Sequence, residues 1–69
     1  MKHGIVESVG TNSLNILVDD DGTMETCDVH PQALISLNRK WVKLSELKAG
    51  DEVTLNGIPP VNSVRATRT

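Results

Sequence analysis

Short apolar segments, separated by clusters of turn-forming residues, run along the whole chain. Several of them alternate between apolar and polar side chains, which is typical of a β-strand with one buried face. The alternation is clearest in residues 13–18, where Leu14 and Ile16 share a face with Val18. At no point do apolar residues recur at helical spacing for more than two turns. The pattern predicts strands at residues 4–9, 13–18, 23–29, 33–37, 52–55 and 61–67, with a short strand or strand edge at 41–44.

Turn residues indicate where these strands end. Asp19-Asp20-Asp21-Gly22 suits a tight turn, because Gly accepts positive φ at little cost and Asp tolerates it better than most residues. Residues 13–29 are therefore the best hairpin candidate. Pro31 predicts a corner, since proline cannot donate a hydrogen bond to a central ladder. Residues 45–48 read as a single helical or 3₁₀ turn, which Gly50 can end in a left-handed conformation.

Short strands at a spacing of about 8–12 residues are typical of a barrel or a sandwich. For 69 residues a closed barrel is the economical form, because closure removes exposed strand edges. We expect one all-β domain over residues 1–69, a small SH3-like or OB-like barrel of five to six short strands with a helical turn near residues 45–48. The expected core is aliphatic and consists of Val6, Leu14, Ile16, Val18, Cys27, Val29, Ile35, Leu37, Leu44, Leu47, Val53, Leu55, Val61, Val64 and Ala66.

Composition narrows the class of protein. Hydrophobic residues make up 38% of the chain, and Trp41 is the only aromatic. No run approaches the roughly 18 apolar residues of a membrane helix, and one cysteine cannot form an internal disulfide. The chain has no stretch that resembles a signal peptide. A soluble cytoplasmic domain without a membrane partner is the default expectation, as long as the chain is not a fragment of a longer protein.

The order of these signals resembles a family of small bacterial β-barrel domains of uncharacterised function. The resemblance spans nearly the whole chain and includes the start, which follows the pattern Gly-x-Val-x-Ser-Val, and a later stretch that follows Leu-x-x-Leu-Lys-x-Gly-Asp-x-Val. It implies the fold rather than a function, and members of the family often sit in longer or exported proteins. The pieces that carry it are Gly4–Val9, Leu14–Val18, Val29–Ile35, Leu44–Val53 and Val61–Ala66.

A weaker likeness concerns self-splicing inteins and hedgehog-type domains. His30-Pro31, then Trp41-Val42 and Leu47–Val53, are similar to the central stretch of those domains. Inteins and hedgehog-type domains need a Cys or Ser nucleophile at their first position and are roughly twice as long. This chain begins Met1-Lys2 and has no terminal His-Asn pair, so we do not expect it to splice.

Metal-ligand chemistry is limited to two His residues, one Cys and nearby acids. A structural zinc site needs four ligands, while Cys27 and Asp28 point to opposite faces of a strand. Asp28 and His30 could form a weak open site. We favour the simpler interpretation, in which Cys27 is a small core residue and His30 is a turn residue beside Pro31. Likewise, an acidic solvated turn is favoured over a calcium loop at residues 19–22, because an EF-hand needs a distal Glu.

No nucleophile, base and orienting group have the spacing that catalysis requires. We therefore expect no enzyme activity, no cofactor and no metal. Our leading hypothesis is a non-catalytic interaction or structural module that can associate with itself or bind a protein partner. The alternative is a small barrel that binds nucleic acid through its basic second half.

The charges are divided between the two halves of the chain. Residues 1–34 carry one Lys and six acids, a net charge of −5, and residues 35–69 carry six Lys or Arg and three acids, a net charge of +3. The basic residues could form a stripe for nucleic acid, with Trp41 as a stacking platform. Alternatively, faces of opposite sign could meet between molecules, or Trp41 could be a plug that closes one end of the barrel. The candidate binding residues are Arg39, Lys40, Trp41, Lys43, Arg65 and Arg68.

Overall fold

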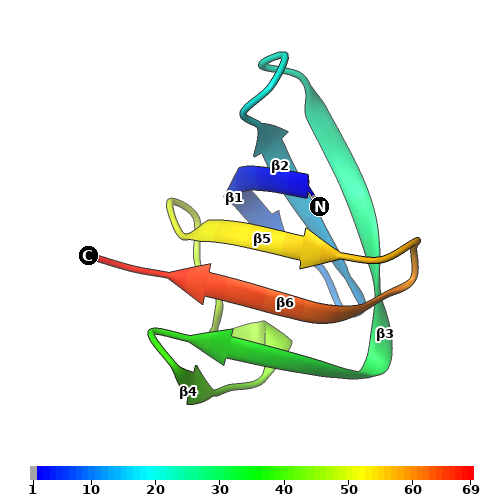
Figure 1. Cartoon of the computed structure of the whole chain (residues 1–69), viewed down its shortest axis with the longest axis vertical. Coiled ribbons are helices and arrows are strands. Elements are labelled where there is room, and N and C mark those ends of the chain that lie inside the picture. Colours follow the sequence, from blue (N-terminus) through cyan, green and yellow to red (C-terminus); the bar gives the residue numbers. More distant parts are fainter. Residues whose placement is uncertain (1) are drawn as a thin grey trace.

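In the computed structural model, which describes residues 2–69, strands make up most of the chain (Figure 1). The one helical element among these residues is a short 3₁₀ turn, η1. The elements in chain order are β1 (Lys2–Val9), β2 (Ser13–Val18), β3 (Met24–Leu37), β4 (Lys40–Trp41), η1 (Leu44–Glu46), β5 (Glu52–Asn56) and β6 (Val61–Thr67).

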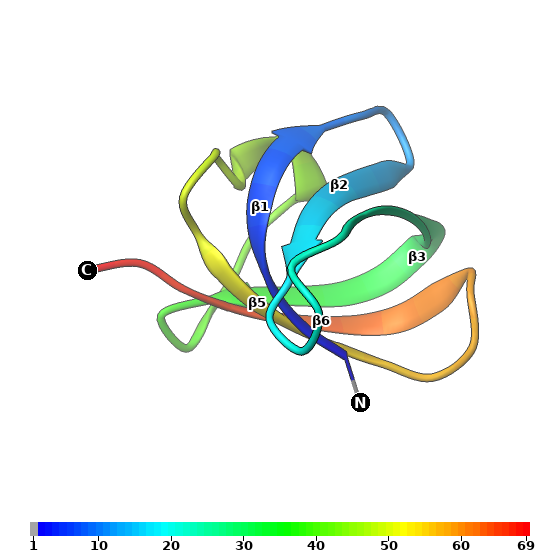
Figure 2. The same ribbon diagram turned by 90° about the horizontal axis from the view of Figure 1, so that it is seen from above.

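The strands close into a barrel, as the sequence predicts. They are ordered β2-β1-β5-β6-β3-β4, and β2 also pairs with β3. This second pairing joins β1, β2, β3, β6 and β5 into a ring of five strands, to which β4 is added beside β3. The ring is mixed, because β3 and β6 run parallel while the other neighbours are antiparallel. Figure 2 shows β1 crossing over β5 and β6, with the turn between β2 and β3 in front of β6.

Strand β3 corrects the prediction of two separate strands at 23–29 and 33–37. The structure has one strand of 14 residues, which bends sharply at its middle (Figure 1). Val29 pairs with Val61 and Leu34 pairs with Ser63, so β3 has more residues than β6 between these two pairs. The bulge contains Pro31, which cannot donate to the ladder. The predicted corner is therefore a bend inside one strand, not a break.

The helical turn predicted near residues 45–48 is present as η1, which begins one residue earlier, at Leu44. The short strand expected at 41–44 is different, because β4 covers Lys40–Trp41. The reason is a tight two-residue turn at Asn38 and Arg39, whose φ values are 51° and 70°. Positive φ at both central residues is the geometry of a two-residue hairpin. The return strand therefore starts at Lys40 and pairs for only two residues.

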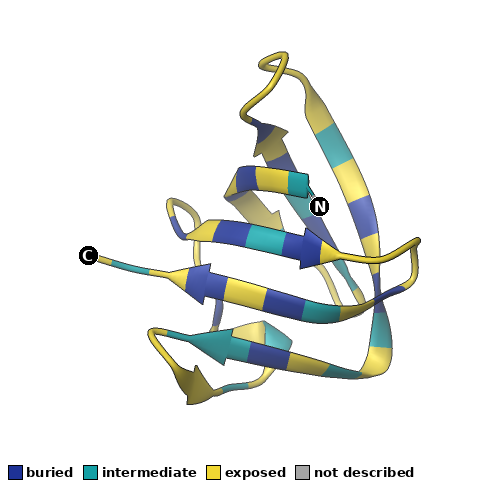
Figure 3. Cartoon of the chain, in the orientation of Figure 1, coloured by how far each residue is buried: buried dark blue, intermediate teal, exposed yellow. Residues whose placement is uncertain are grey.

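The core matches the alternation in the sequence (Figure 3). Leu37 and Leu44, expected in the core, are half-buried and pack against it, whereas the other expected core residues are buried. Cys27 is among them, and burial raises the pKa of its thiol. The buried apolar side chains are Val6, Leu14, Ile16, Val18, Cys27, Val29, Ile35, Leu47, Val53, Leu55, Val61, Val64 and Ala66.

A buried carboxylate, Asp51, connects the segment after η1 to the end of β6. Only 1% of Asp51 is exposed. Its Oδ1 accepts from Nε of Arg68 at 2.7 Å, and its Oδ2 accepts from Nη2 of Arg68 and from the Lys48 backbone N–H, both at 2.8 Å. Backbone bonds between residues 50–51 and Val6 join the same segment to β1. Asp51 therefore links three parts of the chain that are distant in sequence.

Arg68 also depends on the β3–β4 turn. The Asn38 side chain accepts from the Arg68 backbone N–H at 2.8 Å and donates to the Arg68 carbonyl oxygen at 2.9 Å. The Arg68 side chain donates to the carbonyl oxygen of Glu46 at 3.2 Å. The end of β6, η1 and the turn at residues 38–39 are consequently held by one connected set of hydrogen bonds.

We expect Ile16→Ala to lower the free energy of unfolding by about 2–5 kcal/mol, because it leaves a cavity in a closely packed core. A domain of this length has a total stability of only several kcal/mol, on the order of 0.1 kcal/mol per residue. Urea denaturation followed by circular dichroism measures the change. Ile58→Ala is the matched control, since Ile58 is exposed; a similar loss in both variants would contradict the assignment of the core.

We expect Asp51→Ala to cost about 1–3 kcal/mol, because it leaves the Lys48 N–H and the Arg68 guanidinium without their acceptor. The Arg68 hydrogen bonds hold the pKa of Asp51 below its ordinary value of 3.8. The stabilisation by the carboxylate is therefore complete above that value and is lost as the pH falls through the folded-state pKa. Urea denaturation at several pH values should show a decline in acid that Asp51→Asn lacks. An identical acid decline in Asp51→Asn and the unsubstituted chain would refute this role.

Candidate functional site

The turn between β3 and β4 presents Trp41 to solvent. Trp41 pairs with Ser36 across the hairpin, and Ser36 lies between Ile35 and Leu37, whose side chains belong to the core and its margin. The indole is therefore on the outer face of the sheet, and Trp41 is 75% exposed. The interpretation of Trp41 as a plug in the barrel is wrong. Aliphatic side chains fill the interior, Leu47 after η1 among them.

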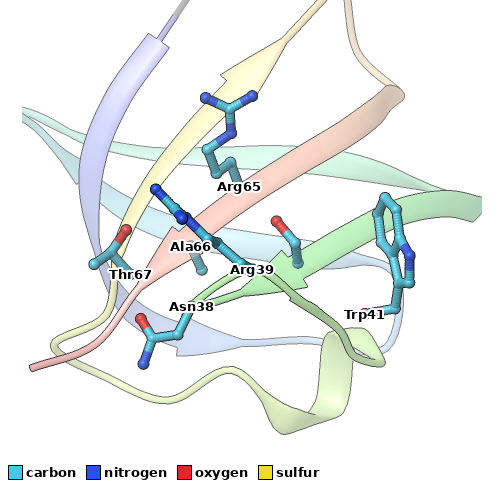
Figure 4. Close-up of a pocket in the computed structure, with 7 residues that line it drawn as sticks. Asn38, Arg39, Trp41, Arg65, Ala66 and Thr67 are labelled. Atoms are coloured by element: carbon cyan, nitrogen blue, oxygen red, sulfur yellow. The ribbon is translucent and has the colours of Figure 1, made fainter.

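Strand register brings Arg65 to the same face. Ser36 pairs with Arg65 on β6 as well as with Trp41 on β4, so the three residues lie on consecutive strands. Arg39 reaches the face from the β3–β4 turn, and Figure 4 shows its side chain directed toward Arg65 and Thr67, with Trp41 on the other side of the hollow. Together they border a shallow open hollow. We call this surface the Trp41 face; its lining residues are Ser36, Asn38, Arg39, Trp41, Arg65, Ala66 and Thr67.

The two guanidinium groups of the Trp41 face form no ion pair within the described part of the chain. Within residues 2–69 the ion pairs are Lys2 with Glu25 and Arg68 with Asp51, so neither Arg39 nor Arg65 pairs with a carboxylate. Both residues are exposed. An incoming anion could therefore accept hydrogen bonds from them without first displacing a carboxylate of the protein.

The structure gathers three of the six residues predicted to bind. Arg39, Trp41 and Arg65 border one hollow. Lys40 and Lys43 are exposed but do not line it. Arg68 is directed to Asp51 instead, and this bond raises the pKa of its guanidinium. The predicted stripe is thus reduced to two arginines and one indole.

Three polar residues of the Trp41 face, Ser36, Asn38 and Thr67, were absent from the prediction. Alternation along residues 33–37 could have placed Ser36 outside, because Ile35 and Leu37 were expected inside. The parallel register between β3 and β6 that sets Ser36 beside Arg65 has no local signal in the sequence. Asn38 owes its place to a positive φ, which Asn tolerates better than most residues.

A second, smaller hollow adjoins Arg65 and Thr67. Its walls include His3 and Thr54, where Nδ1 of His3 and Oγ1 of Thr54 are 3.0 Å apart. Glu52 and Asp19 lie on its acidic side. This hollow mixes charges of both signs, whereas the Trp41 face has only basic ones.

The region suggested for metal binding is organised locally. Nδ1 of His30 accepts a hydrogen bond from the Gln32 backbone N–H at 3.0 Å, which places His30 in the bend beside Pro31. Asp28 is exposed. Among the residues that the structure describes, no three His, Cys, Asp or Glu side chains form a group that could hold a metal ion.

No family model, curated protein or solved structure matches the chain. The likeness to small bacterial β-barrel domains, and the weaker likeness to inteins, therefore stay predictions. In residues 2–69 there is no helix of the length and hydrophobicity needed to span a membrane.

The fluorescence of Trp41 tests the electrostatics of its face, because no other tryptophan contributes. We expect iodide to quench this emission more strongly than caesium at equal ionic strength, since Arg39 and Arg65 concentrate anions near the indole. Replacing both arginines by glutamine should reduce the difference between the two quenchers. Equal quenching of the unsubstituted chain by iodide and caesium would contradict a basic environment around Trp41.

Proposed function

We propose that this domain is a non-catalytic binding module that takes single-stranded nucleic acid on the Trp41 face. The observation that carries the proposal is the 75% exposure of Trp41 beside Arg39 and Arg65, two arginines without carboxylate partners. Exposing a large indole to water has no benefit for the fold of so small a domain. Proteins that bind single strands combine aromatic stacking platforms with a positive groove along the backbone.

Local charge supports the proposal despite a net charge of −2. Six of the nine acids belong to residues 1–34, whereas the Trp41 face is built from residues 36–67. Exposed charges farther apart than about 8–10 Å are largely screened at physiological salt. The charged residues that line the hollow with Trp41 are Arg39 and Arg65, and no acid is among the lining residues.

The strand order favours an OB-like over an SH3-like description, because the third and last strands of the ring run parallel. OB folds bind oligonucleotides and oligosaccharides across their second and third strands. The Trp41 face uses the second half of the third strand, β3, with its neighbours β4 and β6. An oligosaccharide could also stack on Trp41, but Arg39 and Arg65 favour a ligand with negative charge.

Titration with short single-stranded oligonucleotides at low salt, followed by Trp41 fluorescence, tests this function. We expect the emission to be quenched on binding. The logarithm of the binding constant should fall by about 0.7 for each phosphate contact when the salt concentration rises tenfold. Trp41→Ala should lose about 1–3 kcal/mol of binding free energy, measured by anisotropy of a labelled strand. Arg65→Gln should both weaken binding and reduce the salt slope by about 0.7.

Lys43→Gln is the matched control, because Lys43 is an exposed cation outside the face; it should bind nearly as well as the unsubstituted chain. Absence of binding at low salt rules the function out. Equal affinity in Trp41→Ala and the unsubstituted chain would show that the indole does not contact the bound strand. If the domain binds a neutral oligosaccharide with an affinity that does not change with salt, the ligand is an oligosaccharide and not nucleic acid.

A further inference from the structure

Three apolar side chains form a row on the outside of the barrel, across β1, β2 and β3. Leu17 pairs with Ile5 on one side and with Met24 on the other. Strand alternation sends the neighbours Val6, Ile16 and Val18 into the core, so this row faces solvent. Ile5, Leu17 and Met24 are 38%, 40% and 52% exposed. We call this row the apolar strip.

Acidic residues border the apolar strip. The turn Asp19–Asp21 joins the ends of β2 and β3 directly beside Leu17 and Met24. Asp21 is part of the turn itself, because its Oδ1 accepts from the Thr23 N–H at 3.1 Å and the Thr23 hydroxyl at 2.7 Å. At the opposite end of the row, Glu52 pairs with Ile5.

The only Lys or Arg in the half of the chain that carries the strip is Lys2. Nζ of Lys2 donates to Glu25 Oε1 at 2.8 Å, so its charge is already matched. Both side chains of this pair are about two-fifths exposed. The surroundings of the apolar strip are therefore negative, and the Trp41 face is positive.

We propose that the apolar strip docks the Trp41 face of a second copy of this chain, head to tail. The Trp41 face supplies what the strip lacks: the cations Arg39 and Arg65 for the acidic turn, and the exposed indole of Trp41 for the apolar row. Complementary charges steer the encounter and set the orientation, and a Trp at the centre of a contact often contributes much of the binding energy.

A symmetric contact of strip against strip is disfavoured. It would bring the acidic turns of both copies to one interface, where like charges oppose each other. A contact between two different surfaces leaves one strip and one Trp41 face free at the ends. Further copies can therefore add to the first pair.

The proposed contact between the apolar strip and the Trp41 face is small, and it is therefore weak. A stable interface buries about 800 Å² on each partner, which is roughly a sixth of the 4719 Å² surface of this chain. Three partly exposed side chains cover less than that. We expect association at high protein concentration and low salt.

Sedimentation velocity over a range of protein and salt concentrations, without nucleic acid, tests the proposal on the unsubstituted chain. Association should increase with concentration and decrease as salt screens the opposite charges. A monomer under every condition overturns the proposal, and so does association that strengthens with salt, because that is the behaviour of a strip-to-strip contact.

A mixing experiment distinguishes head-to-tail from symmetric contacts. Leu17→Thr with Met24→Thr removes the strip but keeps the Trp41 face, and Trp41→Ala with Arg65→Gln does the reverse. Each double variant alone should associate at least about tenfold more weakly, a loss of about 1.4 kcal/mol. An equimolar mixture should form a 1:1 complex that does not grow, because only one intact pair of surfaces remains.

Circular dichroism and thermal unfolding check that both double variants are folded; the substituted side chains are exposed, and Thr suits a strand. Ile58→Thr is the matched control outside both surfaces and should associate like the unsubstituted chain. A mixture of folded variants that stays monomeric overturns the proposal. The strip variant keeps the Trp41 face, so its oligonucleotide binding reports on the proposed function separately.

Discussion

A single strand, β3, pairs with β2 before its bend and with β6 after it. The ring of five strands closes only because one continuous segment can have these two neighbours. The bulge that contains Pro31 makes the change of direction possible, because it takes residues out of the ladder where proline could not donate. The same bend turns the second half of β3 toward β6, and so brings Ser36 between Trp41 and Arg65.

The buried carboxylate of Asp51 also helps to position the Trp41 face, through a short series of hydrogen bonds. It holds the guanidinium of Arg68, while the backbone of Arg68 is held by the side chain of Asn38. Asn38 is the first residue of the turn that presents Arg39 and leads to Trp41. A charge in the interior is tolerated because it is fully hydrogen-bonded, and its partners hold the turn that presents the exposed side chains of Arg39 and Trp41. Stability and the candidate site are therefore coupled in this domain.

The separation of charge along the chain becomes a partial separation between surfaces, which meet where Asp19 and Glu52 share the smaller hollow with Arg65. Acids border the apolar strip on β1, β2 and β3, and two arginines, Arg39 in the β3–β4 turn and Arg65 on β6, line the hollow with Trp41. A nucleic-acid strand and the acidic turn of a second copy are both negatively charged, so each complements the positive charge of the Trp41 face. The two proposed partners therefore compete for one surface, and the occupied state depends on salt and on the concentration of each.

Local patterns in the sequence were sufficient for most of the strands, the Asp-Gly turn, barrel closure and nearly all of the core, because alternation reports directly on which side of a strand a residue faces. They did not show that β3 is one continuous strand or that β4 ends at Trp41. They were not sufficient for the Trp41 face. Arg65 meets Ser36 through a parallel register between strands far apart in the chain, and Arg68 is withdrawn from the basic set by Asp51. Trp41 lies outside because a two-residue turn and an already filled core leave it no place within. Register, pairing of charges and available volume depend on closure of the whole ring, and no short segment contains that information.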